Sequence, residues 1–274
     1  MSHKLLVVTF QPDLPQFRVF CHCLHRNWQG DKSLIVVVGS NTDRTTVEQI
    51  VALTFDHTWQ VEIKDTVQTT LGGDIEQELN KIVYSINSDT DDVIVFDSKD
   101  FLLRPCNFTT FKQDDRYRVT YKLAGKYLVD MGYNIKDIVD QPVDHLPAVS
   151  NLTPWIWNID QLSKFWQHLN QRFGPYLQWT AFPAGNEIYG YYVYTWTRPD
   201  RPIKWLTHPD MPLLIAGGWT HQTYEGMLQE SKNFDLDPCR VVWKHSRKIT
   251  DARCWKITQQ QLVKHGINLD FEPT

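Results

Sequence analysis

The sequence lacks the common glycine-rich phosphate-binding motifs. No GxxxxGK[ST] segment occurs in its 274 residues, and no GxGxxG follows an expected strand. These absences exclude a P-loop NTPase and a classical dinucleotide-binding enzyme. No G-x-S-x-G segment is present either, so nothing supports the Ser-His-Asp chemistry of the α/β-hydrolases.

Long apolar runs and an even set of cysteines are also missing. The opening MSHKLLVVTF holds an apolar run only from Leu5 to Val8, which is too short for a signal peptide. No segment approaches the roughly 20 apolar residues of a membrane span. The five cysteines are odd in number and widely spread, which argues against a disulfide framework. We expect a cytoplasmic protein with no membrane span.

A basic surface charge is absent as well. The net charge is −4 and the isoelectric point is about 6.2, which argues against a general nucleic-acid binder. Eleven tryptophans and eleven tyrosines would suit a sugar or a base, but aromatic residues fill cores equally well. The composition therefore indicates a globular domain without fixing its ligand.

The first hundred residues alternate between strand and helix patterns. Strands are predicted at 4–10, 33–39, 59–65 and 91–97, and helices at 13–28, 45–55 and 73–87. The run at 33–39 is continuously apolar, which is typical of a strand covered on both faces. This alternation predicts an α/β fold with a mainly parallel, Rossmann-like sheet flanked by helices.

The second half is less regular. Strands are predicted at 117–122 and 212–219, and helices at 159–172, 186–196, 220–231 and 258–266. No linker, repeat or low-complexity segment interrupts the chain. We therefore expect one domain.

The segment CHCLH at 21–25 has closely spaced zinc-ligand residue types. It lies inside a predicted helix, where Cys21 and Cys23 point about 200° apart and do not share a metal. No second C-x-x-C cluster exists. We expect Cys21 in the core and the histidines at the surface.

The segment DSKD at 97–100 follows a buried strand. Ligands of parallel sheets bind at the carboxyl ends of the strands, where residues 9–12 and 39–41 would also gather. Asp97 and Asp100 offer oxygen ligands for a hard divalent cation, and Lys99 offers a positive charge to a phosphate. Alternatively, Asp97 only caps a turn and the other two are solvated.

The helix at 73–87 carries polar residues opposite its apolar face. Gln77 and Lys81 are one helical turn apart, and Tyr84 lies on the same side. A helix packed beside the DSKD strand would direct them at the same ligand. The alternative is an ordinary solvated face.

These segments resemble bacterial and phage proteins of the GT-A glycosyltransferase type. EQELNKI (76–82) resembles their Q-x-x-x-K helix, and IVFDSKDFLLRP (94–105) resembles their D-x-D-like strand end with its "f.rP" continuation. NLTPWIWNIDQLSKF (151–165), FPAGNEIYGYYVY (182–194) and GGWTH (217–221) resemble three later segments of that family. The resemblance spans most of residues 4–225.

The resemblance implies a single GT-A-like domain at 1–230, with a donor half at about 1–110 and an acceptor half at about 111–230. Residues 231–274 would form a C-terminal extension packed on the same domain. The implied activity moves a sugar from a nucleotide-sugar donor to a saccharide or other hydroxyl acceptor, assisted by Mn²⁺ or Mg²⁺. The implied roles are metal binding by Asp97, Asp100 and His221, donor binding by Thr9, Gln77, Lys81, Asp97, Ser98 and Lys99, catalysis by Glu187, and acceptor binding by Trp155 and Trp219.

The chain departs from that pattern at Lys99, where a strict D-x-D has its second acid. Asp100 would supply this carboxylate from a shifted turn, or Lys99 would replace part of the metal's charge, or the activity is lost. The alternative role for Glu187 is that of a capping carboxylate, because an acid near a helix start is favoured by the helix dipole. Two other functions stay open: a non-catalytic nucleotide- or glycan-binding protein, and a sugar nucleotidyltransferase.

Overall fold

The structure is a computed structural model of the chain. It describes residues 2–68, 73–113, 116–123, 146–149, 154–174, 186–199, 203–206, 215–217, 242–244 and 251–271. No helix in these ranges combines the length and the hydropathy that a membrane crossing requires.

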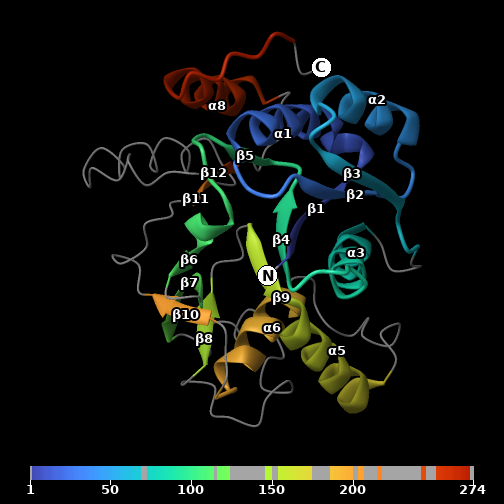
Figure 1. Cartoon of the computed structure of the whole chain (residues 1–274), viewed down its shortest axis with the longest axis vertical. Helices are drawn as coiled ribbons and strands as arrows, with labels where there is room; N and C mark the ends of the chain where they lie inside the picture. The colour runs from blue at the N-terminus through green and yellow to red at the C-terminus, as the bar shows by residue number, and fades with distance from the viewer. Residues whose placement is uncertain are drawn as a thin grey trace.

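A five-stranded sheet forms the centre of the molecule (Figure 1). Its strand order is β3 (Gln60–Asp65), β2 (Ser33–Val38), β1 (His3–Thr9), β4 (Asp92–Asp97) and β9 (Trp155–Asn158). The first four strands are parallel, and β9 runs antiparallel to β4. The α/β class and the mainly parallel sheet predicted from the sequence are confirmed.

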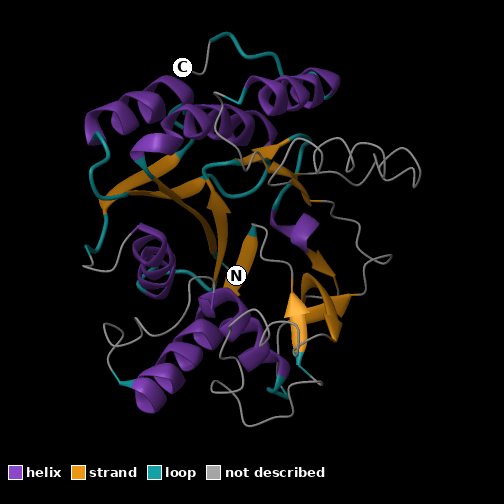
Figure 2. Ribbon diagram, turned by 180° about the vertical axis from the view of Figure 1, so that it is seen from behind, coloured by secondary structure: helices purple, strands orange, loops and turns teal. Residues whose placement is uncertain are grey.

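Helices cover both faces of this sheet (Figures 1 and 2). Alternate residues of a strand point to opposite faces. On β1, Leu5 and Val7 therefore pack in one core with α1 (Leu14–Asn27), α2 (Arg44–Thr54) and α8 (Ala252–Lys264). Leu6 and Val8 pack in a second core with α3 (Gly73–Ile86), α5 (Ile159–Phe173) and α6 (Asn186–Trp196).

Two smaller sheets lie beside the central one. The first contains β6 (Lys112–Gln113), β7 (Arg116–Leu123) and β10 (Ile203–Leu206), with β8 (Pro147–Val149) paired to β7. The second contains β11 (Ile215–Gly217), β12 (Val242–Lys244) and β5 (Asp100–Leu102). Val242 lies opposite Leu102 in an antiparallel pair, so residues late in the chain adjoin the segment that follows β4.

The described helices and strands match the predicted ones within a few residues through β4, and they differ toward the C-terminus. The last helix begins at Ala252, not at 258, because the side chain of Asp251 caps it by accepting a hydrogen bond from the Cys254 N–H. Of the strand expected at 212–219, residues 215–217 are described, and they form β11. The helix expected at 220–231 lies outside the described residues.

The CHCLH segment is more buried than the sequence suggested. Cys21 and Cys23 are both fully buried free thiols, although only Cys21 was expected in the core. Residues after α8 cover the outer side of α1: Phe271 packs against His22 and under the guanidinium of Arg18. Burial raises the pKa of both thiols, so they stay protonated and act as small apolar groups.

Candidate functional site

Four parallel strands end together at one edge of the central sheet, which we call the carboxyl edge. Their last residues are Thr9, Val38, Asp65 and Asp97. Val8 is the register partner of Asp97, so Thr9 lies beside the DSKD turn. The hydroxyl of Thr9 is fully buried and has no hydrogen-bond partner among the described residues.

The DSKD segment is a tight turn between two strands. Asp97 ends β4, Ser98 and Lys99 form the turn, and Asp100 begins β5. The side chain of Asp100 is fully buried, and its Oδ2 accepts a hydrogen bond of 2.8 Å from the backbone N–H of Asp97. The observed contact of Asp100 thus fixes the shape of the turn. Its predicted metal contact stays a prediction.

Lys81 reaches the turn from α3. Its Nζ lies 2.7 Å from Oδ1 of Asp97 and 4.5 Å from the centre of the Trp155 ring. The Lys81 side chain is 3 % exposed and that of Asp97 is 18 % exposed. An ammonium so buried requires a charged partner and gains further from an aromatic face. The structure therefore joins Lys81, Asp97 and Trp155, three of the predicted site residues, in one cluster.

Lys99 points to a different acid. Its Nζ lies 3.1 Å from Oδ2 of Asp13, in the 3₁₀ turn (Gln11–Asp13) that follows β1. The Lys99 side chain is 29 % exposed and that of Asp13 is 16 % exposed. This pair ties the DSKD turn to the loop after β1. Asp13 was not among the residues predicted from the sequence.

Two further residues of α3, Glu76 and Asn80, hold the loops after β2 and β3. Oε1 of Glu76 accepts hydrogen bonds from the Ser40 N–H at 2.8 Å and the Thr66 hydroxyl at 3.0 Å. Asn80 accepts from the Val67 N–H at 2.7 Å and donates to the Thr66 hydroxyl at 2.6 Å. Glu76 is 4 % exposed and Asn80 is fully buried. At Glu76 and Asn80, the polar side of α3 is thus a buried contact surface and not a solvated face.

Glu76→Ala is expected to lower the free energy of unfolding by about 1–3 kcal/mol, because it leaves the Ser40 N–H and the Thr66 hydroxyl without their acceptor. Glu76→Gln is the matched variant, since its side-chain carbonyl keeps an acceptor at the same distance. Urea unfolding of both variants measures the difference. Equal losses for the two variants would contradict this role for the Glu76 oxygen.

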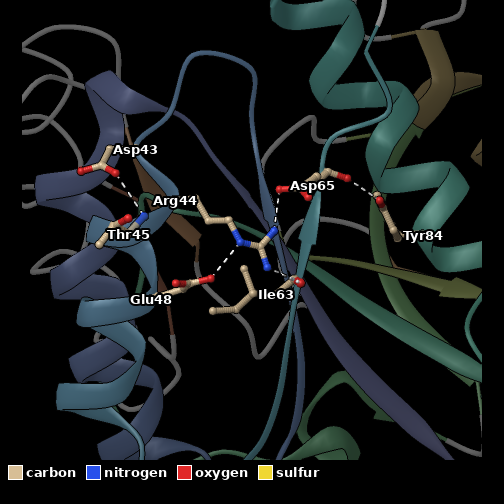
Figure 3. Close-up of polar contacts among 7 residues, drawn as sticks. All are labelled: Asp43, Arg44, Thr45, Glu48, Ile63, Asp65 and Tyr84. Atoms are coloured by element: carbon tan, nitrogen blue, oxygen red, sulfur yellow. Dashed lines mark hydrogen bonds and ion pairs between the residues drawn. The ribbon is translucent and has the colours of Figure 1, made fainter.

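Asp65, at the end of β3, is held from two sides (Figure 3). Arg44 of α2 pairs with the Asp65 carboxylate and donates to the Ile63 carbonyl at 3.3 Å. The hydroxyl of Tyr84, from α3, donates to the backbone carbonyl of Asp65. Burial first, and then the negative charge of Asp65, raise the pKa of Tyr84 above its ordinary value, so this donor keeps its proton at neutral pH.

The structure does not test the roles predicted for five residues. Gln77 lies one turn before Lys81 on α3 and is half-buried. Trp155 is 5 % exposed, and its observed contacts are with Lys81 and Trp157. Glu187 is the second residue of α6, and its side chain lies outside the description, as do residues 219 and 221. The roles predicted for Gln77, Trp155, Glu187, Trp219 and His221 stay predictions.

The described residues fit a divalent cation poorly. No three acidic, histidine or cysteine side chains in the described ranges gather closely enough to hold a metal. Of the two predicted carboxylate ligands, Asp97 faces Lys81 and Asp100 is fully buried against the turn backbone. Hard cations such as Mg²⁺ and Mn²⁺ take several oxygen ligands, and a lysine beside them opposes their charge.

Comparison of the whole fold with solved structures gives a match across nearly the entire chain. The galactosyltransferase LgtC, solved in complex with donor and acceptor sugar analogues, matches with a TM-score of 0.56 and 8 % identity, over 98 % of this chain and 97 % of its own. The fold is that of a GT-A glycosyltransferase. Mouse xyloside xylosyltransferase 1, in its apo form, matches with a TM-score of 0.48 and 9 % identity, over 90 % of this chain and 98 % of its own. No protein-family model and no curated protein sequence matches the chain.

The match to the GT-A fold confirms the fold class that the sequence resemblance implied. In open α/β sheets ligands bind outside the carboxyl ends of the strands. The cluster of Lys81, Asp97 and Trp155 and the pair of Lys99 with Asp13 both lie there. The carboxyl edge is therefore the candidate site of this GT-A fold.

Proposed function

We propose that the protein is a glycosyltransferase that moves a sugar from a nucleotide-sugar donor to a hydroxyl acceptor. The observation that carries the proposal is the position of Asp97 at the carboxyl end of β4, fixed by Lys81 and Asp100. The GT-A fold and the adjoining buried hydroxyl of Thr9 support it. Fold alone does not define an activity, so the proposal rests on this edge.

In the proposed reaction, the bond between the anomeric carbon and the donor phosphate oxygen breaks, and the acceptor oxygen bonds to that carbon. The acceptor proton passes to a base, a role we assign to Glu187. Negative charge grows on the departing diphosphate and requires nearby positive charge. Thr9, Gln77, Ser98 and Lys99 would hold the donor around Asp97 and Lys81, and Trp155 and Trp219 would face the acceptor.

Two sources of positive charge follow from the sequence. The first is Mn²⁺ or Mg²⁺ held by Asp97, Asp100 and His221, which would neutralise the leaving diphosphate. The second is Lys99 in the DSKD turn.

The bacterial or phage origin and the cytoplasmic location stay predictions from the sequence.

A donor panel tests the proposal. Purified protein is incubated with UDP-, GDP-, CMP- and dTDP-sugars in Mn²⁺, Mg²⁺ or EDTA, and nucleotide release is followed. We expect release from one donor, and a loss of about 100-fold or more in Asp97→Asn, which keeps the shape of the side chain and removes its charge. Asp89→Ala is the matched control, since this acid is 87 % exposed and pairs with Lys4 at the opposite edge of the sheet.

The other outcomes separate the alternatives. A nucleotide that binds without turnover on any sugar or hydroxyl acceptor supports the non-catalytic binder, which the lysine at position 99 favours. Consumption of a sugar phosphate with release of pyrophosphate indicates a nucleotidyltransferase. Absence of both binding and release for every donor rules out the transferase.

A further inference from the structure

We propose that Lys99, and not a divalent cation, supplies the positive charge that binds the donor diphosphate. The inference rests on the proposed function and specifies its charge chemistry. In the middle of the DSKD turn, at position 99, this chain has a lysine where the D-x-D pattern has an acid.

The structure holds the Lys99 ammonium at the carboxyl edge. Asp13, in the loop after β1, accepts its contact at 3.1 Å, and DSKD begins at the end of the neighbouring strand β4. Asp13 is largely buried, so it restrains the lysine stem before any ligand arrives. The Lys99 side chain remains 29 % exposed and keeps donors for a ligand, because an ammonium has three. A restrained and accessible cation is suited to a phosphate group.

Lys81 does not fill this role. Its side chain is 3 % exposed, and its charge is already matched by Asp97 at 2.7 Å. Contact with a phosphate would require Lys81 to leave both Asp97 and the face of Trp155. Of the two lysines at the turn, Lys99 is therefore the one that a donor can reach.

The pairing of the described carboxylates at the DSKD turn also disfavours a cation site. Asp97 is paired with Lys81, and Asp13 is paired with Lys99, so two lysines balance two aspartates. The third acid, Asp100, is fully buried and bonds to the turn backbone. A D-x-D turn presents two carboxylates that attract a divalent cation. The DSKD turn instead has an ammonium at position 99, which attracts a phosphate and repels a metal ion.

The test measures binding, so it does not depend on the acceptor. UDP, GDP, CDP, dTDP, ADP and inorganic pyrophosphate are titrated into the full chain by calorimetry, in EDTA and then in Mn²⁺ or Mg²⁺. For the tightest ligand we expect dissociation constants that agree within about threefold in the two conditions, because the protein's own charge does the binding.

Two substitutions at the turn sharpen the test. Lys99→Met keeps the length of the stem and removes the charge, and it is expected to weaken binding in EDTA by about 10- to 100-fold. Lys99→Asp restores the D-x-D pattern, and its binding is expected to be weak in EDTA and to recover when Mn²⁺ is added. Lys4→Met is the matched control, because Lys4 is an ion-paired lysine of similar exposure at the opposite edge of the same sheet.

Three results would overturn the proposed role of Lys99. Wild-type binding that needs Mn²⁺ or Mg²⁺ overturns this inference and leaves the proposed transferase intact. An unchanged affinity in Lys99→Met, with thermal unfolding like that of wild type, also overturns it. Failure of every nucleotide and of pyrophosphate to bind in any condition overturns the proposed function and the inference together.

Discussion

Lys81→Met is expected to lower the free energy of unfolding by about 3 kcal/mol, because it removes one partner of a buried ion pair. The partner left behind is Asp97, which is mostly buried at the end of β4. The lost contact with the face of Trp155 adds to the cost. Urea unfolding of the wild type and the variant measures the change.

A second substitution identifies the cause of the loss. Lys81→Met combined with Asp97→Asn removes both charges, and we expect it to recover part of the stability lost in Lys81→Met alone. Lys164→Met is the control, because its pair with Asp160 is exposed on the surface of α5, and no measurable change is expected there. Equal stability of Lys81→Met and the wild type would show that Asp97 is solvated and not paired.

Trp243→Ala is expected to lower the free energy of unfolding by about 3–5 kcal/mol, since removal of a buried tryptophan leaves a large cavity. Trp243 lies on β12 and is fully buried, and its indole N–H donates to the Thr258 hydroxyl of α8 at 2.9 Å. Trp243→Phe keeps most of the volume and loses that hydrogen bond, so its loss should be smaller. Urea unfolding measures both variants.

The same experiment tests the proposed domain organisation. We propose that residues 231–274 extend the 1–230 domain and pack on it, and the inclusion of Cys254 and Leu262 in the core of β1 and α1 supports this. Far-ultraviolet circular dichroism and tryptophan fluorescence should then report one transition, shifted as a whole in Trp243→Ala. Two separate transitions, of which only one moves, would indicate an independent C-terminal domain.

The long helices and strands of the first hundred residues could be predicted because their sequence signals are local. The continuous apolar run of β2 and the helical spacing of α1 each lie within one segment. β5, β9 and β12 are three or four residues long, and their pairing depends on partners far along the chain. Such short segments give no periodicity to read, so they were missed.

The candidate site was predicted only in part, because some of its signals are local and others depend on tertiary contacts. Asp97 and Lys81 were found because a strand end and a helix face are visible in the sequence. Glu76 was missed because spacing places it away from the apolar face but does not reveal that the loops after β2 and β3 cover it. Asp13 was missed because its partner, Lys99, comes from another strand end. The contacts of a polar residue depend on tertiary packing, which one sequence does not show.

The pairing of β5 with β12 has a consequence for how the protein is made. Asp100 lies opposite Lys244, so the strand that continues the DSKD turn gains its neighbour only after most of the chain has left the ribosome. The four parallel strands can associate with one another earlier, because their parallel partners all lie within the first hundred residues. A nascent or prematurely ended chain would therefore hold the four parallel strands beside an unfinished turn. The protein would therefore become able to bind a ligand only late in its synthesis.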